Sequence, residues 1–97
     1  MTSYLVTYDL VHNASESAYE ELISDLRRLN GHRAQKSVWL VLYNGTADAL
    51  TNRLHAHMHD KEDRLLVVEL KPNSSWESEY CFQGTRDWLK SNVGEPG

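Results

Sequence analysis

Three stretches of the chain carry apolar residues in patterns typical of β-strands, and they span residues 4–10, 33–43 and 63–70. The first alternates, so that one of its faces is apolar: Tyr4, Val6, Tyr8 and Leu10. The second carries apolar side chains on both faces, which is typical of the centre of a sheet. The two faces of the third are nearly equally apolar. These patterns predict a β-sheet at the centre of the fold.

Two further segments repeat apolar residues at helical spacing. The first helix is predicted from Ser17 to Leu29, because Ser17-x-x-Glu20 is a capping-box pattern and Gly31 supplies a stop. The second has Thr46 as its expected cap and the following apolar stripe: Ala47, Leu50, Leu54 and Met58. Thr85 would cap a short last helix that holds Trp88 and Leu89.

The break in the pattern at Pro72 and the polar run after it suggest two parts. Residues 1–71 would form the folded core, and residues 72–97 a C-terminal extension that packs on the core or on a partner subunit. A chain of 97 residues is long enough for one core. Two helices cover only one face of a sheet whose strands are apolar on both. The second face is therefore expected to be covered by a second copy in a homodimer or by the C-terminal segment.

Composition narrows the class of protein. Apolar residues make up 40% of the chain and charged residues 25%, as in soluble globular proteins. No window approaches the roughly 18 apolar residues of a membrane span, and the N-terminus lacks the pattern of a signal peptide. The single cysteine, Cys81, agrees with a reducing compartment. These features predict a cytoplasmic protein without a membrane segment.

The net charge of the chain and the distribution of its cations point to opposite conclusions about nucleic-acid binding. The net charge of −4 argues against a dedicated nucleic-acid binder, which usually has a basic surface. However, Arg27, Arg28, Arg33 and Lys36 fall in a ten-residue window without an acid. These cations would either form a local basic patch, or be solvated, with Arg27 and Arg28 closing the first helix, where cations suit the dipole.

The order of elements, together with "YDL" at residues 8–10 and "RAQKSVW" at residues 33–39, resembles a family of small ferredoxin-like CRISPR-associated adaptation proteins. Members are dimeric partners of the spacer integrase, and some are metal-dependent nucleases. The chain is also similar to the virulence-associated D ribonuclease toxins and to other small bacterial proteins. The resemblance covers about residues 4–70 and implies an α+β fold of βαββαβ type, with an antiparallel sheet and two helices on one face. It expects two strands between the helices, so either a kink near Lys36-Ser37 divides the second run or the sheet has one strand fewer.

The resemblance also implies roles for individual residues. Asp9 would be the catalytic acid and the ligand of Mg²⁺ or Mn²⁺, facing its symmetry mate across the dimer. Two carboxylates held close together repel, so they separate, share a proton or bind a cation. Alternatively, Asp9 would merely end the strand, either by capping the turn that follows or by pairing with a cation. Arg33, Lys36 and Ser37, with Arg28 of the same basic window, would contact nucleic-acid phosphates.

One departure from the family pattern keeps a second function open. After Asp9 many members carry a further acid and paired arginines, whereas this chain has "VHNASESAYEE". The sequence therefore allows either a homodimeric nucleic-acid-binding protein that is a metal-dependent endonuclease, or a non-catalytic homodimer that acts as a regulator or scaffold through protein contacts.

Three smaller patterns have functional and structural interpretations. His55, His57 and His59 near a helix end would either bind zinc or complement the helix dipole. Four aromatic residues of the extension would stack on unpaired bases or clamp the extension to the core or the partner subunit: Trp76, Tyr80, Phe82 and Trp88. Glu69 would join Asp9 as a second carboxylate if their strands are neighbours.

Overall fold

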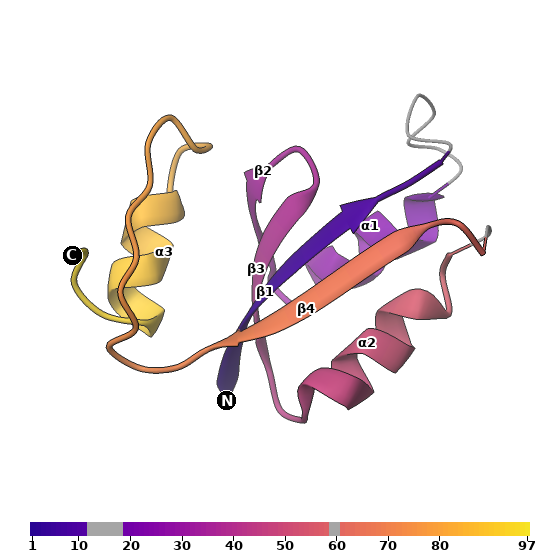
Figure 1. Ribbon diagram of the computed structural model, residues 1–97, viewed down its shortest axis with the longest axis horizontal. Coiled ribbons are helices and arrows are strands. Elements are labelled where there is room, and N and C mark those ends of the chain that lie inside the picture. Colours follow the sequence, from indigo (N-terminus) through magenta and orange to yellow (C-terminus); the bar gives the residue numbers. More distant parts are fainter. Residues whose placement is uncertain (12–18, 59–60) are drawn as a thin grey trace.

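The computed structural model describes residues 1–11, 19–58 and 61–97, and within these it has a single antiparallel sheet with helices on it (Figure 1). The elements in chain order are β1 (Thr2–Asp9), α1 (Glu20–Arg28), β2 (His32–Gln35), β3 (Val38–Tyr43), α2 (Ala47–His55), β4 (Arg64–Leu70) and α3 (Thr85–Asn92). The strand order is β2-β3-β1-β4. The predicted α+β, ferredoxin-like arrangement is confirmed.

The long apolar run between the first two helices is two strands, as a kink at Lys36-Ser37 would require. Those two residues form the turn between β2 and β3. Pairing resumes with Gln35 opposite Val38, and the register shifts between Arg33 and Gln35. The chain lacked an obvious Gly, Pro or Asn turn here, and Arg33 supplies hydrogen bonds that close it instead.

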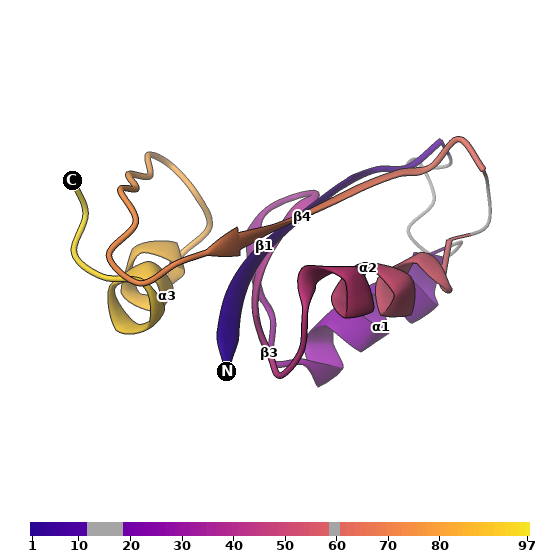
Figure 2. The ribbon, with the colours of Figure 1, turned by 60° about the horizontal axis from the view of Figure 1, so that its bottom comes forward.

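Both α1 and α2 lie on one face of the sheet (Figure 2), which we call the helix face. Alternation along β1 sends Tyr4, Val6 and Tyr8 into this layer, where all are buried. The helices bury their apolar stripes against them; the side chains with no exposed surface are Leu22, Leu26, Leu50 and Leu54. The helix face thus closes within one chain.

The helix ends follow the sequence signals only in part. Thr46 is the N-cap of α2, since its Oγ1 accepts from the Ala49 amide at 3.1 Å, as predicted. The described part of α1 begins at Glu20 after Tyr19, and the Ser17 cap lies outside the described residues. α2 ends at His55, three residues before the predicted Met58. Thr85 is the first residue of α3 rather than its cap, which is Gly84 with φ 95°.

The other face of the sheet, which we call the second face, is covered in part by the C-terminal segment. Leu89 and Val93 of this segment form a buried cluster with Ala34 and Leu40. Trp76 and Trp88 pack against the same cluster. On β4, however, Leu66 and Val68 remain 58% and 44% exposed. The alternative in which the chain's own extension covers the second face therefore holds for the region of β2 and β3.

Among the described helices, none is both long enough and apolar enough to span a membrane.

Candidate functional site

The last residue of β1 is Asp9, whose side chain is 63% exposed on the second face. Arg64, the first residue of β4, lies directly opposite it in the antiparallel register. Arg64 Nη1 donates to Asp9 Oδ2 at 2.8 Å. Of the roles predicted for Asp9, pairing with a cation is therefore present within the chain. An exposed pair of this kind contributes at most about 1 kcal/mol to stability.

The turn between β2 and β3 brings together three of the predicted phosphate-contacting residues. Arg33 donates to the Lys36 carbonyl through Nε at 2.9 Å and through Nη2 at 2.7 Å. Its guanidinium also lies 5.4 Å from the centre of the Trp39 ring. The Tyr8 amide donates to the Ser37 carbonyl at 3.1 Å, which attaches the turn to β1 one residue before Asp9. The turn is thus rigidly held while the Lys36 side chain is exposed.

Although they occupy one end of the sheet, Asp9 and Arg33 belong to different faces. Arg33 is opposite Trp39, and Trp39 is opposite Val6, so all three lie on the helix face. Asp9 is an odd number of residues from Val6 and lies on the second face. A ligand that touched both would have to pass around the β2–β3 turn, where Lys36 is exposed.

Arg28 is not part of this turn. It lies in a polar cluster between α1 and α2, with its Nη1 3.8 Å from Asp25 Oδ1. Asp25 is only 3% exposed and accepts two hydrogen bonds from Arg53, at 2.9 and 2.6 Å. His57 Nε2 lies 3.1 Å from Asp25 Oδ2. Arg53, and after it His57, lower the pKa of Asp25 below its ordinary value despite burial.

The Asp25 cluster was not predicted, although the sequence contained a signal for it. Asp25 lies three residues after Leu22 and four before Leu29, so it shares their helical stripe. An acid on a buried stripe requires a cationic partner. With Arg53 and His57 bound to it, this carboxylate links the two helices and is almost closed to solvent.

Glu69 does not join Asp9, and this interpretation was wrong. The strands β1 and β4 are neighbours, but Glu69 is opposite Tyr4, near the other end of β1. It also shares the face of Tyr4, the helix face, whereas Asp9 is on the second face. Alternation and register together exclude a carboxylate pair between these two residues.

The surroundings of Asp9 contain few of the ligands that Mg²⁺ or Mn²⁺ needs. Such ions take several oxygen ligands in octahedral geometry. The described part of the chain contains no group of three or more His, Cys, Asp or Glu side chains able to hold a metal. A guanidinium already contacts the Asp9 carboxylate, and its charge would repel a cation. The residues that the structure describes at Asp9 in one chain do not fit a divalent metal.

The histidines and the C-terminal aromatic residues do not all take the same role. His57 is bound to Asp25, and His59 lies outside the described residues, so the zinc hypothesis for the run stays a prediction without support from His57. Trp76 and Trp88 clamp the extension to the second face. Tyr80 and Phe82 instead are exposed.

Arg64 was also missed, because its role depends on strand register. The sequence shows an Asp63-Arg64 pair before the last strand, but only the alignment of β1 with β4 brings Arg64 to Asp9. Asp63 faces the other way, and its Oδ1 accepts from the Val11 amide at 2.9 Å and from the Tyr19 hydroxyl at 3.0 Å. Two adjacent residues thus fasten opposite sides of the same strand end.

A comparison with known protein families gives a match that agrees with this fold. The family model described as CRISPR associated protein Cas2 matches residues 1–77, from β1 through β4 and into the C-terminal segment. This match covers the Asp9 strand, the β2–β3 turn and the strand that carries Arg64, so the chain belongs to the CRISPR-associated Cas2 family.

Proposed function

We propose that this CRISPR-associated protein is a homodimer that holds nucleic acid at the β2–β3 turn, and that it does so without a metal-dependent step at Asp9. The observation that carries the proposal is the turn itself. Arg33 fixes its backbone by two hydrogen bonds, which leaves Lys36 exposed beside the end of β1. A lysine presented on a rigid turn suits a phosphate, because little conformational freedom is lost on binding.

Homodimer formation is supported by the uncovered part of the second face. Leu66 and Val68 expose apolar surface on β4, which is an edge strand of the sheet. An exposed apolar edge strand favours pairing with another chain. Two copies joined there would present two β2–β3 turns, and so two cationic positions, to one nucleic acid.

The ion pair of Asp9 supports binding without cleavage. Arg64 neutralises the carboxylate at 2.8 Å, and no other described acid lies with it in a metal-binding group.

The family's metal-dependent cleavage with Mg²⁺ or Mn²⁺ is the second candidate function, favoured by the 63% exposure of Asp9. It requires that a second copy bring its own Asp9 close and that Arg64 move aside. We also propose the cytoplasm as its compartment and a spacer integrase as a protein partner.

Binding is tested by fluorescence anisotropy of labelled duplex DNA and single-stranded RNA with Lys36→Ala and with Lys71→Ala. Lys71 is an exposed lysine beyond the other end of β4 and is the matched control. The Lys36 variant should bind several-fold more weakly and reduce the slope of log K against log salt by about 1. If Lys36→Ala and Lys71→Ala weaken binding equally, or if neither nucleic acid binds, the proposed site is wrong.

A further inference from the structure

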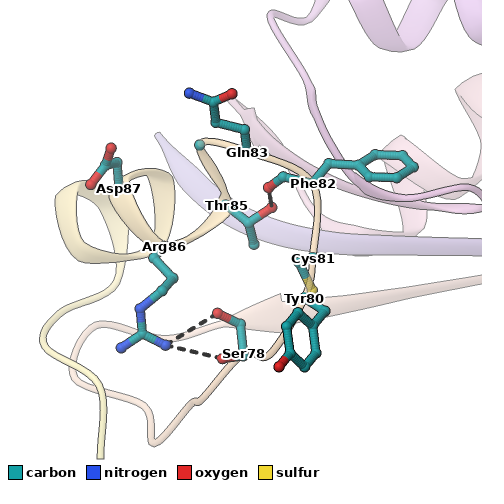
Figure 3. A pocket seen from close by; sticks show the side chains of 9 residues that line it. Ser78, Tyr80, Cys81, Phe82, Gln83, Thr85, Arg86 and Asp87 are labelled. Atoms are coloured by element: carbon teal, nitrogen blue, oxygen red, sulfur yellow. Dashed lines mark hydrogen bonds between the residues drawn. The ribbon is translucent and has the colours of Figure 1, made fainter.

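The C-terminal segment contains a hollow of about 190 Å³ between the loop at residues 78–84 and the first turn of α3 (Figure 3). It is remote in the sequence from Asp9, and it belongs mostly to the part of the chain beyond the family match, which ends at residue 77. In Figure 3 the rings of Tyr80 and Phe82 point away from the loop backbone in different directions. Neither the fold nor the proposed nucleic-acid contact accounts for these two side chains.

The loop that carries them is fixed to the edge of the sheet. The Phe82 amide donates to the Ala34 carbonyl of β2 at 2.9 Å. The Thr85 hydroxyl donates to the Phe82 carbonyl at 2.7 Å, and it also lies 2.8 Å from His32 Nε2. Through its hydroxyl, Thr85 links the loop at Phe82 to His32 of β2. The loop therefore presents its side chains from a defined backbone.

The two aromatic side chains are unusually exposed for such a fixed loop. Tyr80 is 97% exposed and Phe82 is 52% exposed. Tyr80 also has φ 60°, a left-handed conformation that is uncommon for residues other than glycine. Strained residues held in this way occur frequently at binding sites. Exposed aromatic residues are typical anchors of protein interfaces, where they fill pockets of the partner.

Charge around the hollow selects the kind of partner. Three exposed acids, Glu77, Glu79 and Asp87, flank it, against two exposed cations, Arg86 and Lys90, so acids are in excess by one. Arg86 is already bound to Glu77 and to the Ser78 carbonyl, and it lies over the Trp76 ring. The Ser78 amide, and after it Arg86, lower the pKa of Glu77, which keeps this acid charged. An acidic surface of this kind repels phosphates and attracts cations.

We propose that the loop at residues 78–84 is a docking surface for a protein partner that offers an apolar surface flanked by lysine or arginine. Tyr80 and Phe82 are the anchors that pack on this apolar surface, and Glu79 with Asp87 pair with the partner's cations. The partner is a protein rather than a nucleic acid because the surface is acidic. This surface uses other residues than the β2–β3 turn and Asp9, although its loop is bound to β2 through the Ala34 carbonyl.

The test uses a fluorescent peptide of alternating lysine and leucine, a matched glutamate and leucine peptide, and polylysine, each titrated with the full-length protein. The lysine–leucine peptide should bind more tightly than the other two, since it alone combines charge with apolar surface. Tyr80→Ala combined with Phe82→Ala should weaken its binding at least tenfold, and Glu79→Gln combined with Asp87→Asn should weaken it severalfold. Leu66→Ser, which alters the other exposed apolar surface, should leave it unchanged.

The same variants separate this proposal from the nucleic-acid proposal. Tyr80→Ala with Phe82→Ala should leave DNA binding and the mass of the protein in solution unchanged, while Lys36→Ala should leave peptide binding unchanged. Unchanged circular dichroism would show that the loop variants fold, as expected for side chains this exposed. Equal peptide binding by the wild type and the aromatic double variant would overturn the docking surface. Loss of DNA binding in that variant, or a halved mass, would instead assign these residues to nucleic acid or to a second copy.

Discussion

The helix face and the second face of the one sheet are closed in different ways. On the helix face, Leu22, Leu26, Leu50 and Leu54 have no exposed surface, and the layer is complete within one chain. On the second face, the C-terminal segment buries Leu89 and Val93, but Leu66 of β4 is left 58% exposed. The comparison indicates that the helix face provides most of the stability, while the open part of the second face is available for contacts with other molecules.

Two aspartates show the same contrast in their polar contacts. Asp25, on the helix side, has a side chain that is 5% exposed and is bound by Arg53 and His57. Asp9, on the second face, has a side chain that is 63% exposed and is paired with Arg64. A charge so deeply buried depends on its partners, whereas an exposed pair exchanges readily with water and salt. The role of each aspartate therefore follows from its burial and its partners, and not from its position along a strand or helix.

The largest expected difference between the faces comes from truncating one leucine on each. Leu54→Ala removes a fully buried side chain of the helix face and should lower the free energy of unfolding by about 3–5 kcal/mol. Leu89→Ala, in the C-terminal cluster, should lower it by about 2 kcal/mol, because this side chain is 8% exposed and its layer is incomplete. Urea unfolding measures both. A greater loss for Leu89→Ala would reverse the assignment of stability to the helix face.

The next effect concerns the buried aspartate. Asp25→Asn should cost about 2–3 kcal/mol, because Arg53 loses a charged acceptor. Asp48→Asn, an exposed acid in the first turn of α2, is the control and should cost under about 1 kcal/mol. Similar losses for the two variants in thermal or urea unfolding would show that the Asp25 cluster is not stabilising.

The pH dependence of stability follows from the same contact. Arg53, followed by His57, holds the pKa of Asp25 below its ordinary value of 3.8. The folded state thus releases this proton more easily than the unfolded state, so the contribution is fully present above that ordinary value. It is lost as the pH falls through the lower pKa of the folded state. Wild-type stability should therefore fall below about pH 4 more steeply than that of Asp25→Asn. Parallel curves from acid titrations followed by circular dichroism would contradict this.

On the second face, Leu66→Ser should act on assembly rather than on folding. Leu66 is 58% exposed in the single chain, so the substitution should change the unfolding free energy of the monomer by under about 0.5 kcal/mol. It should nevertheless lower the mass measured by light scattering at micromolar concentration toward that of a monomer. Val11→Ser, at an exposed apolar residue beyond the end of β1 and outside the surface of Leu66 and Val68, should keep the dimer. A wild type that is already monomeric would remove the homodimer from the proposal.

The smallest expected effect is that of the exposed ion pair. Arg64→Ala should change the free energy of unfolding by less than about 1 kcal/mol, since both side chains are largely exposed. The change should shrink further in high salt, because salt screens exposed charges. A loss of several kcal/mol in urea unfolding would mean that Arg64 holds the end of β1 in place.

The sequence predicted the elements that depend on local pattern. The stripes of α1 and α2 needed only helical spacing and the cap at Thr46 only a capping residue before it, while the resemblance supplied the two strands between the helices. What failed depended on register and on distant contacts. Glu69 was placed with Asp9 because strand alternation says which residues share a face but not which faces of two strands coincide. Arg64 as the partner of Asp9 required the same missing register.

For a related reason, the sequence did not decide what covers the second face of the sheet. Apolar residues on both faces of the strands showed that a cover was needed, but Trp76 and Leu89 fit the chain's own core and a partner's core equally well. Which of these forms depends on the path of the chain after Pro72, and that path is set by contacts such as the Phe82 amide with the Ala34 carbonyl.

The central claim, that Asp9 is a paired acid on a nucleic-acid-binding protein, is tested most directly by one assay. The wild type and Asp9→Ala are incubated with labelled single-stranded RNA and duplex DNA in Mg²⁺, in Mn²⁺ or in chelator, and both cleavage and binding are followed. The account predicts that nucleic acid is bound equally with and without metal, is not cut, and is bound comparably by the variant. Cleavage that requires the metal and disappears in a folded, dimeric Asp9→Ala protein would contradict it and establish Asp9 as the catalytic acid.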